Sequence, residues 1–146
     1  MRTLPILATI VGLLLAGCEK ARLDDEVRRL CAKDGGIKVY EVVVLPLSRF
    51  DQYGAIRIPS KEDAKSTDEF YYVSETTYLR SGDPEMWRTR HQIVRAKNGK
   101  LLGERISYSR RGGDIPGSWH ESSFGCPASD VRPSLEETIF MKDYTK

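Results

Sequence analysis

Residues 110–126 of the 146-residue chain bring acid, base, hydroxyl and glycine residues together in one segment, the strongest candidate in the sequence for a chemical site. Asp114, His120, Ser122 and Ser123 are the residue types of a nucleophilic triad, in which a histidine takes the serine proton and an acid orients the histidine. Such triads are built by fold geometry rather than by closeness in sequence, and the segment has no G-x-S-x-G nucleophile turn. The sequence therefore predicts a protein that is not an enzyme. A hydrolase that uses the His120 loop is the alternative.

The same segment also suits binding, because long loops with aromatic and basic residues are common recognition surfaces. Its candidates are Arg110, Arg111, Trp119 and His120. The structural alternative is that the glycines of the segment let the chain turn sharply after a strand, while Trp119 covers the edge of the core.

A second chemistry is indicated by Leu15-Ala16-Gly17-Cys18, which ends a short apolar run that follows Arg2. This order is typical of a cleavable export signal, and the run is shorter than the ~20 residues that span a bilayer. In the bacterial lipoprotein precursors that the motif resembles, the cysteine thiol is acylated and the chain is cut before it. We therefore expect residues 1–17 to be a lipoprotein signal peptide and Cys18 to be lipidated. An uncleaved anchor is the alternative.

The expected lipid also indicates a location. Each buried methylene contributes about 0.8 kcal/mol, so several acyl chains give effectively permanent anchoring. In envelopes that resemble the enteric model, aspartate after the lipidated cysteine favours the inner membrane, but here the residue is Glu19. We expect the outer membrane, with the domain facing the periplasm, and an inner-membrane location as the alternative.

With Cys18 assigned to lipid, Cys31 and Cys126 remain. In an oxidising periplasm two such thiols most simply form a disulfide, which would stabilise the fold by about 4 to 5 kcal/mol in the chain-entropy model. Two buried free cysteines, or a metal site with His91 or His120, are the alternatives. The spacing matches no zinc pattern, so we expect no metal and no cofactor.

The charge balance limits the classes of binding partner that we expect. The formal net charge is +2, and 22 basic against 21 acidic residues remain after removal of residues 1–17, whose only charge is Arg2. Nucleic acid is therefore not expected as a partner. Residues 86–111 nevertheless hold eight Lys and Arg against the single Glu104, an asymmetry that the neutral total hides.

An N-terminal helix is expected over residues 19–33, because Leu23, Val27, Leu30 and Cys31 fall on one helical stripe. Acidic residues crowd its first turn and basic residues its last, in line with the helix dipole. The two glycines at 35 and 36 then end it. The stripe is expected to dock on the domain, and a helix lying on a membrane is the alternative.

Strands are expected at residues 37–45 and 70–80, which are rich in β-branched and aromatic residues. Residues 48–59 are expected to be irregular and residues 61–68 to form an exposed loop. Residues 134–141 suit a strand or a short helix, and the sequence leaves both open.

A hairpin is expected around Asn98-Gly99, a dipeptide typical of a two-residue type I′ turn. Counting outward from that turn pairs His91 with Ile106 and places His91 on the apolar side as a satisfied, partly buried histidine. The expected core side is made of Trp87, Ile93, Leu102, Ile106 and Tyr108. The opposite side would carry Arg88, Arg90 and Arg105 and form a basic binding face.

These elements predict an α+β fold, with the N-terminal amphipathic helix packed on a small antiparallel β-meander sheet of about four strands. Residues 18–146 are expected to form a single lipid-anchored periplasmic domain.

Three segments, residues 30–41, 99–104 and 111–114, are similar to a family of small uncharacterised proteobacterial lipoproteins. The resemblance implies lipidation and export, and it brings no activity, ligand or catalytic residue.

The sequence therefore predicts a non-enzymatic envelope lipoprotein, anchored in the membrane by its N-terminal lipid, that binds another envelope component. Its basic face would meet an acidic patch on an envelope protein, anionic lipid or lipopolysaccharide phosphates. An entry-exclusion factor that blocks an outer-membrane receptor and an envelope hydrolase are the alternatives.

Overall fold

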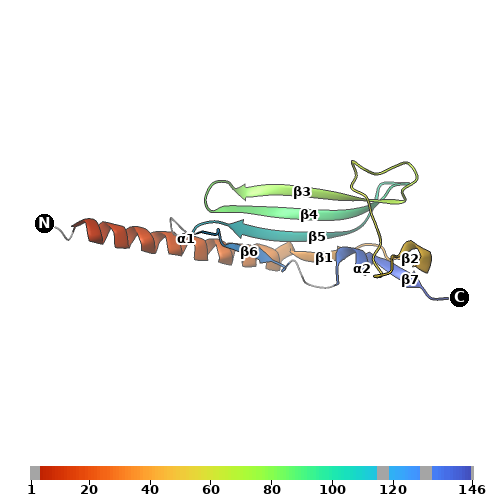
Figure 1. Cartoon of the computed structure of the whole chain (residues 1–146), viewed down its shortest axis with the longest axis horizontal. Helices are drawn as coiled ribbons and strands as arrows, with labels where there is room; N and C mark the ends of the chain where they lie inside the picture. Colours follow the sequence, from red (N-terminus) through yellow and green to blue (C-terminus); the bar gives the residue numbers. More distant parts are fainter. Residues whose placement is uncertain (1–3, 115–118, 129–132, 146) are drawn as a thin grey trace. The chain divides into compact units, whose positions relative to one another are not determined.

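The computed structural model describes residues 4–114, 119–128 and 133–145, with side chains from Glu19 onward (Figure 1). The chain divides into two compact units. Unit 1 contains Met1–Gly35, Thr76–Arg88 and Ser107–Ser129, and unit 2 contains Gly36–Glu75, Thr89–Ile106 and Asp130–Lys146. The single domain over residues 18–146 and the signal peptide stay predictions.

Helix α1 spans Leu4–Asp34 and contains the expected amphipathic segment. Leu23, Val27 and Cys31 are buried, as the stripe predicts, and α1 packs against strand β6 (Ser123–Cys126). The Gly35 N–H makes the last helical hydrogen bond, to the Cys31 carbonyl at 2.8 Å, and the helix ends because Gly36 takes a positive φ of 105°. A Cβ on Gly35 would lie 2.7 Å from the Cys31 sulfur, so only glycine fits there. Within the residues whose side chains are described, no helix is long and apolar enough to cross a membrane.

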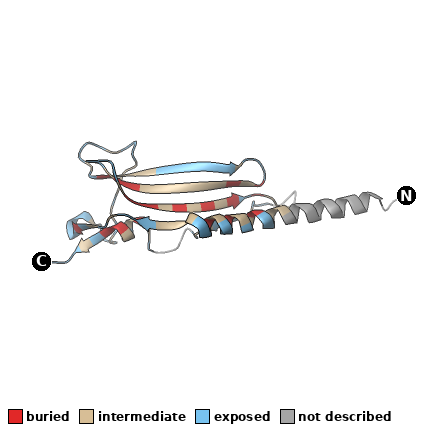
Figure 2. Cartoon of the chain, turned by 180° about the vertical axis from the view of Figure 1, so that it is seen from behind, coloured by how far each residue is buried: buried red, intermediate tan, exposed pale blue. Residues whose placement is uncertain are grey.

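The main sheet has the order β1-β5-β4-β3, with β6 also paired to β5. Its long strands are β3 (Phe70–Arg80), β4 (Glu85–Arg95) and β5 (Lys100–Arg111). The short strand β1 (Gly36–Val39) pairs antiparallel with the first half of β5, and β6 pairs antiparallel with the second half. Buried residues alternate with half-buried ones along much of β5 (Figure 2). The predicted α+β class, with a helix on a mainly antiparallel sheet, is confirmed, and the strand predicted at residues 70–80 is β3.

The turn between β4 and β5 differs from the prediction. A type I′ turn needs positive φ at both central residues. In the described residues only glycines have positive φ, so Gly99 (φ 67°) meets this condition and Asn98 does not. The turn instead covers residues 96–99, and the Gly99 N–H bonds to the Arg95 carbonyl at 2.9 Å.

The predicted register is wrong for the same reason, since a one-residue change in pairing moves side chains to the other face of a strand. Arg88 and Tyr108 were expected on opposite faces of the sheet. Both side chains nevertheless contact Asp34, with Arg88 Nη2 at 3.6 Å and the Tyr108 hydroxyl at 2.7 Å. Trp87 was expected on the core side with Tyr108, but its ring contacts that of Tyr78, which is exposed, with 6.2 Å between the centroids of the tilted rings. Ile93, Leu102, Ile106 and Tyr108 are buried as expected.

The single strand predicted at residues 37–45 is two strands. After β1, the N–H groups of Tyr40 and Glu41 both bond to the Leu102 carbonyl, at 2.8 and 3.0 Å, and the chain leaves the main sheet there. Strand β2 (Val43–Pro46) then pairs in parallel with β7 (Phe140–Asp143) as a second, two-stranded sheet. Uninterrupted β-branched residues predict extended chain, but they do not show where a strand changes sheets.

The C-terminal segment, left open between strand and helix, contains both. Helix α2 (Leu135–Ile139) begins with a capping box formed by Ser134 and Glu137, and β7 follows it directly. The expected irregular stretch contains only the short 3₁₀ helix η1 (Leu47–Arg49). The core of unit 2 joins these parts to the main sheet through Leu45, Phe70, Ile93, Leu102, Leu135, Ile139 and Phe140.

Candidate functional site

Cys31 and Cys126 form the predicted disulfide, with their Cα atoms 5.9 Å apart and a sequence separation of 95 positions. The bond joins α1 to β6 within unit 1. Disulfides persist in oxidising compartments, so the bond indicates a location outside the cytoplasm. Cys18 lies among the residues whose side chains are not described.

Arg110, predicted as a binding residue, is 1% exposed. Its Nε donates to the Asp24 carboxylate at 2.8 Å. Its Nη1 donates to the Gly112 carbonyl at 2.7 Å and to the carbonyl and hydroxyl oxygens of Ser122 at 3.0 and 2.9 Å. A buried guanidinium with these four bonds connects α1, β5 and the chain before β6, so its place in the structure is that of an internal support.

Asp114 and Ser122, two members of the possible triad, contact each other and the helix. The Asp114 carboxylate accepts from Lys20 Nζ at 2.7 Å and from the Ser122 N–H at 2.5 Å. The Lys20 ammonium and the Ser122 hydrogen bonds hold the pKa of Asp114 well below its usual range. The Ser122 hydroxyl faces the Arg110 guanidinium, which is a donor and cannot take a proton from it. These contacts tie the loop to the helix.

Arg111, Trp119 and His120 lie on the surface of unit 1. Arg111 is paired with Glu85 at 3.0 Å and with Glu121 at 3.1 Å. His120 is exposed, and Trp119 is 96% exposed, so Trp119 does not cover the core. Residues 115–118 of the segment lie outside the described residues.

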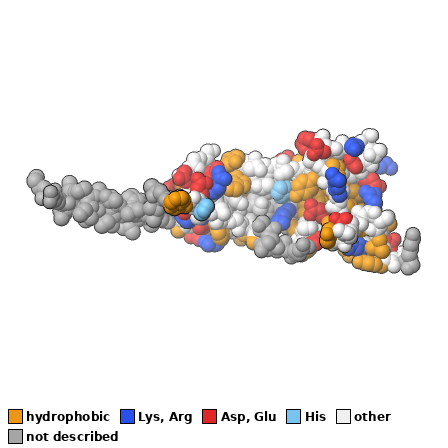
Figure 3. Space-filling model, viewed as in Figure 1, with side chains coloured by type: hydrophobic (Ala, Val, Ile, Leu, Met, Phe, Trp, Pro, Cys, Tyr) orange, Lys and Arg blue, Asp and Glu red, His pale blue; other side chains and the backbone are white. Residues whose placement is uncertain are grey.

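Two of the three arginines predicted to form a basic face, Arg88 and Arg90, contact acidic groups. Arg88 meets Asp34, and Arg90 Nε lies 2.6 Å from the buried Glu104 carboxylate. Burial raises the pKa of Glu104, but hydrogen bonds from Tyr40 and Arg90 outweigh burial and hold the pKa below its usual value. On the face seen in Figure 3, Lys and Arg lie among Asp and Glu rather than in one positive patch.

Arg105 is half-buried and lies near Tyr72 and His91 in unit 2. The Tyr72 and His91 rings contact each other at a tilt of 36°, with 5.4 Å between centroids. Burial raises the pKa of Tyr72 to about 12 and lowers the pKa of His91, which the Arg105 charge lowers further. The His91 Nδ1 is buried without a hydrogen-bond partner, so the expectation of a satisfied histidine is wrong. No group of three or more His, Cys, Asp and Glu residues that could hold a metal occurs in the described parts of the chain.

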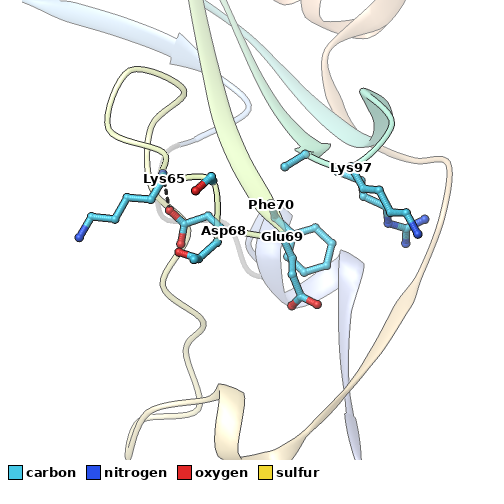
Figure 4. A pocket seen from close by; sticks show the side chains of 9 residues that line it. Lys65, Asp68, Glu69, Phe70 and Lys97 are labelled. Carbon is cyan, nitrogen blue, oxygen red and sulfur yellow. Dashed lines mark hydrogen bonds between the residues drawn. The ribbon is translucent and has the colours of Figure 1, made fainter.

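Unit 2 also has a hollow of about 610 Å³ that sequence reasoning missed. It lies between the loop before β3 and the β4–β5 turn, and Lys65 and Lys97 stand on opposite sides of it (Figure 4). Its carboxylates are engaged: Asp68 accepts from the Lys65 N–H at 2.7 Å, and Glu69 pairs with Arg49. Residues 61–68 read as an ordinary polar loop, so no sequence signal could have marked this hollow.

An exposed apolar surface is a second feature that the sequence did not reveal. Val44 and Met141 are direct partners in the β2–β7 pair, and they are 62% and 53% exposed. Val42 and Tyr144, next to these strands, are also exposed. The alternate residues Leu45 and Phe140 face the core of unit 2. The outer face of this small sheet therefore exposes Val44 and Met141 side by side to water, next to the exposed pair of Pro46 and Asp143.

The chain matches no protein-family model, no curated protein and no solved structure.

Proposed function

We propose that the protein is a non-enzymatic lipoprotein of the bacterial envelope, anchored by lipid on Cys18, that binds another envelope protein. The motif that ends at Cys18 and the Cys31–Cys126 disulfide both support an exported protein. Glu19 after the lipidated cysteine supports the outer membrane, with the folded chain facing the periplasm. The resemblance to small proteobacterial lipoproteins supports lipidation and export.

The observation that carries the binding role is the outer face of the β2–β7 pair, defined by Val42, Val44 and Met141. Exposed apolar side chains that lie together on the surface of a protein in water mark sites of interaction. Both strands also lie at the edge of a two-stranded sheet in the described structure, so their outer backbone groups can accept an added strand. The partner of the β2–β7 face is therefore a protein that presents an apolar surface or an extended segment.

The contacts of Asp114 and Ser122 support a role other than catalysis. The Asp114 carboxylate is held by Lys20, and the Ser122 hydroxyl accepts from Arg110. A serine nucleophile needs a base that takes its proton, and a guanidinium is always protonated.

Photo-crosslinking in intact cells tests the binding role. A photoreactive residue at position 44 should give one discrete product with an exported protein. Adding Met141→Lys should abolish it, because the charge would have to be desolvated at the contact. Thr77 is an exposed position of β3 in unit 1 and serves as the matched control for labelling. If position 44 gives no product, or the same products as position 77, the proposed binding face is wrong.

A further inference from the structure

The two residues that follow Cys18 are already part of the folded chain. Glu19 pairs with Arg80 at 2.7 Å, and Lys20 pairs with Asp114 at 2.7 Å. Consecutive Cα atoms are about 3.8 Å apart. The lipid-bearing residue therefore adjoins the folded surface of unit 1 directly, and no flexible linker separates them.

These two ion pairs identify which surface adjoins Cys18. Arg80 ends β3 and leads into the turn before β4, and Asp114 belongs to the chain that follows β5. The two segments contact each other, because the Gly113 N–H donates to the Asp83 carboxylate at 2.6 Å. The start of the mature helix, the β3–β4 turn, residues 112–114 and Ser122 thus meet at one end of unit 1, which we call the anchor end.

Trp119 belongs to the anchor end. It lies three positions before Ser122, whose N–H is bound to Asp114, so its Cα is within about 10 Å of that contact. The neighbouring Glu121 is fixed by its pair with Arg111. Trp119 is 96% exposed, and Leu79 beside Arg80 is also exposed. A fully exposed indole is unusual in water, and tryptophan is enriched at the level of lipid headgroups, where its ring is buried and its N–H stays wet.

We propose that the anchor end lies against the membrane that holds the Cys18 acyl chains, with Trp119 in the headgroup region of the bilayer. The proposal rests on the lipidation of Cys18 in the proposed function and is independent of the β2–β7 face. The nearby cations Lys20, Arg80 and Arg111 are each paired with a carboxylate. The contact is therefore interfacial rather than electrostatic, and it depends weakly on anionic lipid and on salt.

Tryptophan fluorescence of the lipidated protein in vesicles tests this placement. The protein is reconstituted into phosphatidylcholine vesicles with and without brominated acyl chains, and the chain is compared with Trp119→Phe. Trp87, whose ring contacts that of Tyr78, is present in both proteins. The difference between their emission spectra therefore reports Trp119 alone. Brominated lipid should remove most of the Trp119 emission. Adding anionic lipid or salt should change this loss little.

Two controls separate the possible failures. The chain without lipid, beginning at Glu19, should show no quenching, and a Gly-Ser insertion between Cys18 and Glu19 should weaken the quenching in the lipidated protein. If the lipidated protein floats with the vesicles but Trp119 emission is unquenched, the placement of Trp119 at the membrane is wrong. Anchoring through the lipid on Cys18 would then be unaffected. If mass spectrometry finds no acyl groups on Cys18, both proposals are wrong.

Discussion

The buried pair of Arg110 and Asp24 gives a prediction whose size follows from the structure. The Arg110 side chain is 2% exposed and the Asp24 side chain 18%. Removing one partner of a buried pair leaves a charge without compensation and costs about 3 to 5 kcal/mol. Three hydrogen bonds from Arg110 Nη1 remain in Asp24→Ala, so we expect the lower end, about 3 kcal/mol.

The adjacent residue provides the control. Asp25 pairs with Arg28 on the exposed side of α1, with side chains 76% and 58% exposed. Such a pair contributes about 0.5 kcal/mol or less, so Asp25→Ala should leave stability nearly unchanged. Urea unfolding of the disulfide-bonded protein, followed by circular dichroism, measures both. With slopes of about 1 to 3 kcal/mol per molar urea, Asp24→Ala should lower the midpoint by about 1 M or more.

A second variant separates the loss of charge compensation from the loss of packing. Asp24→Ala with Arg110→Met removes both charges and keeps an apolar side chain of similar length in the site. It should recover much of the lost stability, because replacing a buried pair with apolar residues is often neutral. The reasoning fails if Asp24→Ala lies within about 0.5 kcal/mol of Asp25→Ala, the value for an exposed pair.

Three further predictions concern other parts of the chain. Cys31→Ser with Cys126→Ser should lower the free energy of unfolding by about 4 kcal/mol, measured by urea unfolding; a change below about 1 kcal/mol would contradict a loop-closing role. Gly99→Ala should cost about 1 kcal/mol because of its positive φ, and Asn98→Ala should cost less; equal costs in thermal unfolding would favour a type I′ turn. Tyr72, with a pKa of about 12, should ionise after the exposed tyrosines in an ultraviolet titration. Its pKa is raised on folding, so its contribution to stability is complete below pH 10 and is lost as the pH rises towards 12; Tyr72→Phe should remove this loss, and an unchanged pH profile would count against it.

The features that local pattern determines were predictable. The stripe of Leu23, Val27 and Cys31 identified the buried side of the helix, because helical spacing alone places those side chains together. The disulfide followed from counting cysteines after Cys18 was assigned to lipid. Strand β3 was found because its β-branched and aromatic residues form one uninterrupted run.

Features that depend on distant contacts were not predictable. Asn98-Gly99 predicted a turn but did not determine how many residues the turn contains, and the register of β4 and β5 depends on that number. Arg88 and Arg90 looked like part of a basic face because the sequence does not show which acids they meet: Arg88 contacts Asp34 at the end of α1, and Arg90 contacts Glu104 on the neighbouring strand β5. The β2–β7 face arises from parallel pairing of two strands that lie far apart in sequence, which no local pattern reveals.

Mass spectrometry of the protein extracted from bacterial membranes tests the central claim most directly. A chain that is anchored as proposed should begin at Cys18, carry acyl groups on that residue, and retain the Cys31–Cys126 bond. Recovery of a chain that keeps residues 1–17, or that begins at an unmodified Cys18, would contradict the claim.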